Sequence, residues 1–496
     1  MMHRKVQGCW IRQDAGCFIL LSNDNLVIQI SRNIIKYLQE WSTKLHRKPL
    51  LLRGARQVGK SSAVRAYVAE GVRLGSLDGI VELNLEANPL DGDLLTGQGE
   101  PRDLLRLIEA RFGRSIVPGR TVLFIDEVQR RPDVIKALWF WYEQLPNLHI
   151  IAAGSLLDVV LRQGEFSMPV GRIEHCFMGP LTFSEFLGGV GDTKLAELIS
   201  VYRFGDPWPE PIHQYLLKRL RDFWAVGGMP EAVATFAATG SLLAVESIKR
   251  SVTTTYQDDF AKYAGRFSLN LIQRVFRKVP TLVGQRAKFV EFDRDSSSLQ
   301  VRTALELLAM ARVITRVRRT SGAGLSFGAD ANDSLAKYLF LDVGLSLSMC
   351  DFDPSVLLHA DDLTLVNRGS IAEQFIGQHL LYSRPPFYEP ELYYWERTEK
   401  SASAEIDFLI AHGETVVPIE VKSGAPGRMK SLQLFCTKNS TPTAVRFSTA
   451  LPERTALSAN TTLLSLPLYL VEQTRRLLGD KQGGASDDEK AATEPR

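Results

Sequence analysis

The sequence contains few cysteines, and they form no recognisable site. Five cysteines occur among 496 residues, and no two of them have the spacing of metal ligands or of a redox pair. An odd number of scattered cysteines is typical of reduced thiols, which argues against a secreted disulfide scaffold and predicts a cytoplasmic protein. The cysteines are Cys9, Cys17, Cys176, Cys350 and Cys436.

The sequence also lacks a long apolar run. A membrane-spanning helix needs roughly 18 apolar residues, whereas the nearest candidate, residues 149–161, is short and is interrupted by Ser155 and Asp158. The first 22 residues contain neither a clean apolar core nor the small-residue cleavage site of a signal peptide. These absences predict a protein without membrane contact.

A strong net charge is missing as well. The formal net charge is +3, with 45% hydrophobic and 23% charged residues, which is ordinary for a folded protein of roughly three domains. The total charge excludes no class of partner, but its distribution is uneven. Residues 265–319 contain 12 Lys and Arg against 4 Asp and Glu, a local charge of +8, so the rest of the chain carries −5.

The clearest motif that is present lies between a strand-like apolar run and a helix-like run, a context that argues against a chance glycine turn. "GARQVGKS" fits the phosphate-binding pattern G-x-x-x-x-G-K-[ST]. Glycines let backbone N–H groups curl around phosphate oxygens, and a helix N-terminus favours an anion. We expect Lys60 to reach the β- and γ-phosphates of ATP, and the Ser61 hydroxyl to bind Mg²⁺. The predicted nucleotide contacts are Gly54, Ala55, Arg56, Gln57, Val58, Gly59, Lys60, Ser61 and Ser62.

Two further apolar runs have polar residues at their ends. "TVLFIDEVQR" contains Asp126 and Glu127, and we expect Asp126 to hold Mg²⁺ and Glu127 to be the base that polarises the attacking water. "LHIIAAGSLLD" carries Ser155, which is placed either to sense the γ-phosphate or the water, or simply to cap a helix. Arg172 is a candidate cation for transition-state charge, although single arginines are usually solvated or paired at the surface.

Strand-like runs alternate with helical stretches in this part of the chain, with a further strand in "IVELNLEANP". Such alternation predicts an α/β fold, in which a parallel sheet is covered by helices on both faces. The sequence therefore predicts a P-loop core.

Five segments, in this order, resemble a large family of bacterial and archaeal AAA-type ATPases: "LLLRGARQVGKSS", "FIDEVQ", "IIAAGSLLD", "PVGRIEHCFMGPLTFSEF" and "AVGGMPEAV". The resemblance covers about residues 30–475. It implies an AAA+ ATPase with a C-terminal domain of unknown function that is similar to restriction endonucleases. Ser61 and Ser62 stand where the family usually has two threonines, and either hydroxyl can bind Mg²⁺. The nucleotide-site residues that it implies are Lys60, Ser61, Asp126, Glu127, Ser155 and Arg172.

The expected organisation follows the changes of pattern along the chain, including a helix, a glycine turn and a second helix around "AVGGMPEAV", which resemble the lid of an AAA core. The polar tail is poor in aromatic residues, which is typical of disorder. The expected parts are an N-terminal extension (1–29), an AAA-type core (30–200), a helical lid (201–264), a winged-helix-like domain (265–350), a restriction-endonuclease-like domain (351–475) and a disordered tail (476–496).

The basic stretch contains two helical patterns followed by a basic strand, which suggests a winged helix. Such a module can place a helix in a DNA groove and a basic wing on phosphate. The alternatives are a solvated basic face, a domain interface or a docking module for a protein. The candidate nucleic-acid contacts are Arg274, Arg277, Lys278, Arg316, Arg318 and Arg319.

A second group of charges lies in "AEIDFLIAHGETVVPIEVKSG", which reads as a β-hairpin. Residues two apart in a strand share a face, so Glu420 and Lys422 point the same way, and Asp407 lies nearly opposite Glu420. The pattern is similar to the core of restriction-endonuclease-like nucleases, which implies that Asp407, Glu420 and the helix residue Glu373 hold Mg²⁺ and that Lys422 steadies the attacking water. The alternatives are an exposed hairpin with a salt bridge, and a fold that keeps the site but cleaves nothing.

The sequence therefore predicts an ATP-hydrolysing AAA-type protein that acts on or with DNA. It also predicts a nuclease-like domain, and it leaves open whether that domain cleaves DNA with Mg²⁺. One alternative is a nucleotide-switched DNA- or protein-binding module with a catalytically silent nuclease-like domain. Another is an ATP-dependent remodeller of a protein partner. The Asp126–Glu127 pair favours hydrolysis over simple binding, whereas only the basic stretch favours DNA. Assembly into a homo-oligomer is compatible with each of these three hypotheses.

Overall fold

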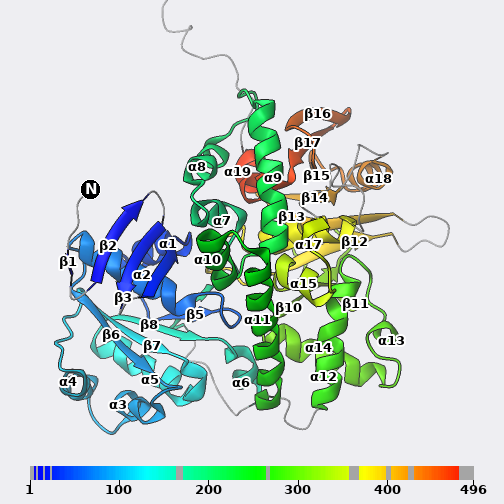
Figure 1. Cartoon of the computed structure of the whole chain (residues 1–496). Helices are drawn as coiled ribbons and strands as arrows, with labels where there is room; N and C mark the ends of the chain where they lie inside the picture. The colour runs from blue at the N-terminus through cyan, green and yellow to red at the C-terminus, as the bar shows by residue number, and fades with distance from the viewer. Residues whose placement is uncertain are drawn as a thin grey trace, which may run out of the picture.

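In the part of the chain that it describes, the computed structural model contains three β-sheets of four, five and eight strands (Figure 1). The four-stranded sheet comes first in the chain, the five-stranded sheet follows, and the eight-stranded sheet is formed by the second half. The structure describes residues 5–6, 9–14, 17–22, 25–163, 171–263, 268–356, 368–397, 404–422 and 429–479.

The first sheet is an antiparallel meander built from residues that the sequence analysis expected only as an extension. Its strands pair in chain order. At the end of its last strand, Ile30 lies beside Gly189, so the meander is attached to the helices that follow the second sheet. The strands are β1 (Lys5–Val6), β2 (Cys9–Asp14), β3 (Cys17–Ser22) and β4 (Asn25–Ile30).

The five-stranded sheet is wholly parallel, in the order β6-β7-β8-β5-β9. Strands β7 and β8 are buried at every position, as expected for strands that are covered on both faces. The strands are β5 (Leu50–Arg53), β6 (Gly79–Asn84), β7 (Thr121–Asp126), β8 (His149–Gly154) and β9 (Glu174–Phe177).

Helices cover both faces of this sheet, and each face has its own hydrophobic core. Helices α1 (Ile34–Ser42) and α2 (Lys60–Arg73) pack on one face. Helices α3 (Asp93–Thr96), α4 (Pro101–Phe112) and α5 (Pro132–Gln144) pack on the other. The predicted parallel sheet with two covered faces is therefore confirmed.

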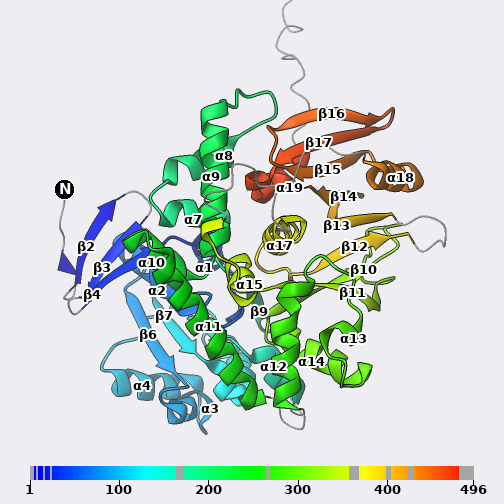
Figure 2. The ribbon, with the colours of Figure 1, turned by 45° about the vertical axis from the view of Figure 1, so that its right-hand side comes forward.

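The middle of the chain is helical. The predicted helix, glycine turn and second helix are present as α9 and α10, and α9 and α11 stand between the two large sheets (Figure 1; Figure 2). The helices are α6 (Leu157–Gln163), α7 (Phe183–Gly189), α8 (Thr193–Val201), α9 (Glu210–Val226), α10 (Pro230–Thr239) and α11 (Leu242–Tyr263).

The eight-stranded sheet has the order β11-β10-β12-β13-β14-β15-β17-β16. Its strands are β10 (Ile314–Arg319), β11 (Asn332–Phe340), β12 (Leu392–Glu396), β13 (Glu405–His412), β14 (Thr415–Val421), β15 (Thr443–Ser448), β16 (Glu453–Ser458) and β17 (Thr461–Pro467). The helices of this half are α12 (Leu269–Lys278), α13 (Phe289–Phe292), α14 (Ser298–Met310), α15 (Val343–Met349), α17 (Arg368–Leu381), α18 (Lys430–Asn439) and α19 (Thr474–Gly479).

The basic strand of the expected winged helix is not an isolated wing. Strand β10 pairs antiparallel with β11 and parallel with β12, so both β10 and β11 belong to the sheet of the C-terminal domain. The two predicted helices, α12 and α14, are present beside it. The sheet therefore crosses the boundary that the sequence suggested at residue 350.

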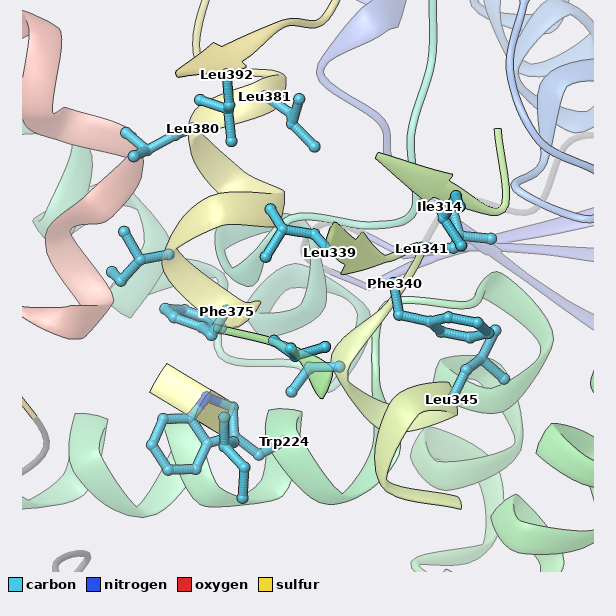
Figure 3. Close-up of a cluster of buried hydrophobic side chains, with 14 of the residues drawn as sticks. Trp224, Ile314, Leu339, Phe340, Leu341, Leu345, Phe375, Leu380, Leu381 and Leu392 are labelled. Carbon is cyan, nitrogen blue, oxygen red and sulfur yellow. The ribbon is translucent and has the colours of Figure 1, made fainter. Parts of the chain in front are cut away.

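Helices α9, α10 and α11, the basic segment and the C-terminal sheet share one hydrophobic core. Figure 3 shows part of it, where Trp224 of α9, Phe340 of β11 and Phe375 of α17 point into a common cluster. The rings of Trp224 and Phe375 are 6.2 Å apart, and those of Phe340 and Phe276 of α12 are 5.3 Å apart. The second half of the chain is therefore packed as one unit.

The described part of the chain ends in a short helix. The tail was expected to be disordered from residue 476, but residues 474–479 form α19. The remainder of that prediction, residues 480–496, lies outside the described residues. No helix in the ranges described above is both long enough and apolar enough to cross a membrane.

His379 joins α7, which follows the five-stranded sheet, to the C-terminal half. Its ring lies in α17, where Nε2 accepts the backbone N–H of Phe183 at 2.9 Å and Nδ1 lies 2.7 Å from the carbonyl oxygen of Phe375. Burial lowers the pKa of His379 to about 4, and the hydrogen bond to Phe375 only partly opposes this. The folded protein therefore holds His379 neutral.

We expect His379 to make the protein less stable in acid. The unfolded state takes up a proton below about pH 6.5, whereas the folded state does not until about pH 4, so each pH unit between them costs about 1.4 kcal/mol of unfolding free energy. Denaturant unfolding at pH 5 and pH 7 measures this loss. His379→Gln should show a pH dependence smaller by about 2 kcal/mol, while the exposed His46→Gln should match wild type. Equal pH dependence in all three proteins would contradict the assignment.

Candidate nucleotide site and a second charged cluster

The phosphate-binding loop connects β5 to α2, and its two glycines are required for different reasons. A Cβ atom on Gly54 would overlap the carbonyl oxygen of Met178. Gly59 has a φ of +91°, in the left-handed region, and a Cβ atom there would lie 3.3 Å from Cγ of Pro230. Gly54 therefore provides space, and Gly59 provides a backbone conformation that other residues rarely adopt.

The guanidinium of Arg32 holds the backbone of this loop through hydrogen bonds. Its Nη1 donates to the carbonyl oxygen of Val58 at 2.7 Å, and its Nη2 donates to that of Gly179 at 2.8 Å. Its Nε lies 3.1 Å from Oε2 of Glu185 in α7, so the buried charge is paired. Because Arg32 is only 9% exposed, breaking this network would leave a buried charge unsatisfied.

Lys60 lies inside the loop at the start of α2. Its Nζ donates to the carbonyl oxygens of Gly54 at 3.1 Å and Ala55 at 2.8 Å. Burial lowers the pKa of Lys60 to about 8, although the charges of Glu127 and Asp126 partly oppose this. A buried ammonium that its surroundings disfavour gains from a nearby anion, which suits a phosphate-binding role.

Ser61 and Asp126 meet beside Lys60, as predicted. The Ser61 hydroxyl donates to Oδ2 of Asp126 at 2.7 Å, and Oδ1 accepts the backbone N–H of Glu127 at 3.0 Å. Burial raises the pKa of Asp126, the Ser61 hydrogen bond opposes the rise, and the charge of Glu127 adds to it. A hydroxyl and a carboxylate of this kind fit Mg²⁺, which would neutralise phosphate charge beside them.

Glu127 is held by a residue that the sequence analysis did not assign. Glu127 has a φ of +54°, and its Oε2 accepts a short hydrogen bond from Nε2 of Gln129. The same Nε2 lies 3.4 Å from Oγ of Ser155, and a Cβ atom on Gly154 would lie 2.7 Å from Oε1 of Gln129. Gln129 therefore links the proposed base to the end of β8. Its position in "FIDEVQR", two residues after Glu127, was the available signal.

Helix α11 contacts the outer side of the loop. The Tyr256 hydroxyl donates to the carbonyl oxygen of Arg56 at 2.6 Å, and Nη1 of Arg56 lies 2.6 Å from Oδ2 of Asp259. The phosphate-binding loop is therefore packed directly against the helical region that follows the five-stranded sheet.

Arg172 does not reach this site within the chain. It precedes β9, at the amino edge of the parallel sheet, whereas the phosphate-binding loop lies at the carboxyl edge. Its Nη2 lies 3.1 Å from Oε1 of Glu143 on α5, and its side chain is 45% exposed. Strand direction thus separates Arg172 from the nucleotide of the same chain, which corrects its expected catalytic role there.

The C-terminal hairpin brings the predicted charged residues together. The register of β13 and β14 places Asp407 across from Glu420, and Oδ2 of Asp407 accepts the backbone N–H of Val421 at 2.7 Å. Nζ of Lys422 lies 2.6 Å from Oε1 of Glu420. Burial opposes the charged form of Lys422, but the hydrogen bond to Glu420 and the surrounding carboxylate charges outweigh burial and raise the pKa of Lys422.

A second lysine, which was not predicted, lies among these carboxylates. Nζ of Lys337, on β11, is 3.0 Å from Oε1 of Glu373 and 3.9 Å from Oδ1 of Asp407, and it also pairs with Glu405. Burial alone would lower the pKa of Lys337, but the three carboxylates outweigh it and raise the pKa. Burial raises the pKa of Glu373 to about 7, with Asp407 adding to the rise and Lys337 opposing it.

This arrangement does not fit the expected metal site. Within the part of the chain that the structure describes, no three His, Cys, Asp or Glu side chains are grouped so as to hold a metal ion. Lys337 lies against Glu373 and Asp407, and Lys422 lies against Glu420. The expected Mg²⁺ ligands are thus present, but as partners of ammonium groups.

The predicted wing arginines are held within the chain. Arg318 pairs with Glu391, and Nη2 of Arg319 lies 3.3 Å from the carbonyl oxygen of Glu396. Arg316 lies 3.7 Å from a carboxylate of α14 and is only 17% exposed. These three residues of β10 therefore take part in internal contacts, which corrects their expected role as an open phosphate-binding wing.

The predicted basic residues of α12 are more accessible. Arg274 pairs with Asp293 at 2.9 Å but remains 48% exposed. Arg277 donates to the side-chain oxygen of Gln257 at 3.2 Å, and both Arg277 and Lys278 are exposed at the end of the helix. The accessible part of the basic stretch is therefore the last turn of α12.

Three family models match successive parts of the chain. Residues 46–187 match an AAA domain, and this part is therefore an AAA-type P-loop domain. Residues 217–356 match a domain of unknown function, DUF8612, and residues 368–469 match another, DUF4143. The second of these agrees with the C-terminal domain of unknown function that the resemblance implied. A comparison with the curated proteins finds no match.

Several solved structures are similar to the chain at low identity. PCH-2 of C. elegans shares 13% identity, over 45% of this chain and 70% of that chain, with a TM-score of 0.28. ORC1 of Aeropyrum pernix, in complex with DNA, shares 13% identity over 66% and 94%, with a TM-score of 0.28. AMPPCP-bound DnaA of Aquifex aeolicus shares 15% over 55% and 86%, with a TM-score of 0.24.

We expect Glu127→Gln to bind ATP normally and to hydrolyse it at least about 100-fold more slowly, because its carboxylate acts on water and not on the nucleotide. Equilibrium binding of ATP and steady-state phosphate release measure the two effects. Lys60→Ala should lose both, since it removes the buried cation of the loop. Glu143→Gln, on the exposed face of α5, should change neither. A normal rate of phosphate release from Glu127→Gln would place the base elsewhere.

Proposed function

We propose that the protein is an ATPase whose turnover changes the contacts between its AAA-type domain and its C-terminal half, and that it acts together with DNA. The nucleotide site supports hydrolysis, because the hydroxyl and carboxylate of Ser61 and Asp126 suit a cation, and a separate carboxylate suited to act as the base, Glu127, is held by Gln129. A site for binding alone would need no such base.

The observation that carries the proposal is an ion-pair network that begins at the phosphate-binding loop. Arg53 directly precedes Gly54, and its guanidinium pairs with Asp158 of α6. Asp158 also pairs with Arg312, whose Nε lies 2.8 Å from Oδ2. Arg312 lies between α14 and β10, so one carboxylate links the loop strand to the C-terminal half.

The surroundings of this network support a coupling role. Arg53 and Arg312 both stack on the ring of Phe177, with guanidinium carbons 5.1 Å and 4.7 Å from its centre. Burial and the nearby charge of Arg312 lower the pKa of Arg53 to about 10. Nη2 of Arg312 also lies 3.2 Å from Glu389, before β12. Two like charges that share one carboxylate form an arrangement that a small shift can repartition.

A cavity beside the network leaves room for such a shift. Its volume is about 680 Å³, and its walls come from both parts of the chain, including His175 of β9 and Tyr382 after α17. A movement of β5 that accompanies a change of nucleotide would therefore first alter the contacts of Asp158 and Arg312, and would then displace the strands that follow Arg312.

DNA is the partner that we propose for the basic segment, with Arg277 and Lys278 as its contacts. These residues are exposed, and positive charge at the end of a helix can neutralise phosphates. A protein partner is the second candidate, because the arginines of β10 already bind internal carboxylates. Cleavage of DNA forms no part of the proposal, since the carboxylates do not fit a metal site.

We expect Arg312→Gln to uncouple the two halves. With the Glu127→Gln background to keep ATP bound, ATP should slow hydrogen exchange in α2 and also alter exchange in residues 306–319. Arg312→Gln should retain the first effect and lose the second, because Asp158 then has no partner in the C-terminal half. Arg302→Gln, which removes only a surface pair with Glu306, is the matched control. Persistence of both effects in Arg312→Gln would refute the coupling.

We expect Arg277→Glu/Lys278→Glu to weaken binding to duplex DNA and to flatten its salt dependence, by roughly 0.9 in log–log slope for each phosphate that is no longer neutralised. Titrations at several salt concentrations measure both quantities. Lys194→Glu/Lys218→Glu makes the same change of charge on exposed residues of α8 and α9, and it should leave the slope unchanged. A wild-type protein without salt-dependent DNA affinity would favour the protein partner instead.

A further inference from the structure

We propose that the ammonium of Lys337 is the permanent cation of the carboxylate cluster formed by Glu373, Glu405 and Asp407, and that it occupies the place which a nuclease of the resembled kind gives to a divalent metal. The C-terminal domain then binds no metal there, and the cluster serves as a joint, centred on a buried lysine, between strands and a helix that are distant in sequence.

The position of Lys337 supports a structural cation. Its residue is 1% exposed, on the edge strand β11. Its Nζ contacts carboxylates from two other elements: Glu373 of α17 at 3.0 Å, and Glu405 and Asp407 of β13. A buried lysine is tolerated when several anions surround it, and this one has three.

The carboxylates expected to bind metal are all occupied by ammonium groups. Lys337 contacts Glu373 and Asp407, and Lys422 contacts Glu420. Asp407 also accepts the backbone N–H of Val421 at 2.7 Å, which uses its other oxygen. A divalent ion at this point would have to displace an ammonium from a site where its charge is already balanced.

The space around Glu373 is filled as well. Gly284 has a φ of +78°, and a Cβ atom there would lie only 2.6 Å from Oε2 of Glu373. The ring of Tyr394 lies on another side, with its centre 5.3 Å from Nζ of Lys337. Mg²⁺ requires six ligands in octahedral geometry and usually keeps several waters, so an ion at this point would need the place that the Lys337 ammonium takes.

One carboxylate oxygen near the cluster, on Glu420, could still accept another cation. Oε2 of Glu420 is buried and has no hydrogen-bond partner among the described residues. Its other oxygen pairs with Lys422, whose side chain is 42% exposed. Metal binding that starts from Glu420 is therefore the outcome that would most directly oppose the proposal, and the experiment is designed to detect it.

The test uses the full-length protein with Asp126→Asn, which removes the carboxylate proposed for metal at the nucleotide site, without nucleotide present. Binding of Mn²⁺ is measured from the paramagnetic resonance signal of the free ion. We expect no bound Mn²⁺ up to 1 mM. Adding Lys337→Met should expose three carboxylates. This double variant should therefore bind one Mn²⁺ with an affinity at least tenfold higher than the 1 mM limit of the protein with native Lys337. Lys422→Met is the matched control and should not gain that affinity.

Thermal unfolding keeps the proposal testable if Lys337→Met folds poorly. We expect its unfolding temperature to fall and to recover in part with Mn²⁺, while the Asp126→Asn protein with native Lys337 shows no shift. The proposal is overturned if that protein binds one Mn²⁺ and loses it with Asp407→Asn or Glu420→Gln. It is also overturned if a folded Lys337→Met gains no affinity, because Lys337 would then not stand in a metal's place.

Discussion

The carboxylate of Asp342 is the interaction on which the arrangement of the two halves depends. It is fully buried, and it accepts the backbone N–H of Gly228 at 2.6 Å and that of Leu345 at 3.0 Å. Burial raises its pKa, and these hydrogen bonds oppose the rise. Its first partner belongs to the turn before α10, where Pro230 packs against Gly59 of the phosphate-binding loop. One side chain at the start of α15, just after β11, thus helps to position the nucleotide site of a different sheet.

This dependence limits how ATP can act on the molecule. Helices α9, α10 and α11, the basic segment and the C-terminal sheet share a core, and α11 contacts the loop through Tyr256. Large separation of the halves would expose that core, at a cost of roughly 25 cal/mol for each Å² of apolar surface. Small shear movements that repartition polar contacts cost far less. The Arg53–Asp158–Arg312 network is such a contact, since it lies at the junction and outside the apolar core.

The parts of the fold that could be predicted are those encoded by neighbouring residues. The strand before Gly54, the pair Asp126–Glu127 and the C-terminal hairpin each depend on local pattern, and each has the predicted position. Lys337 could not be found in this way, because its partners lie 36 to 70 positions further along the chain. The β10 arginines looked accessible for the same reason. Arg318 contacts Glu391 only because β10 lies beside β12. The residues near β10 in the sequence do not indicate that β12 is its neighbour.

Two buried lysines, Lys60 and Lys337, show how a binding site differs from a structural ion pair. Burial alone lowers the pKa of both ammonium groups. At Lys60 burial prevails over the opposing charges of Glu127 and Asp126, and the pKa falls to about 8. At Lys337 three carboxylates prevail and the pKa rises. A bound anion stabilises a buried ammonium whose charge is not balanced. An ammonium that is already surrounded by carboxylates gains no such stabilisation from a further anion. The charge balance therefore favours a ligand site at the loop and a closed joint in the C-terminal sheet.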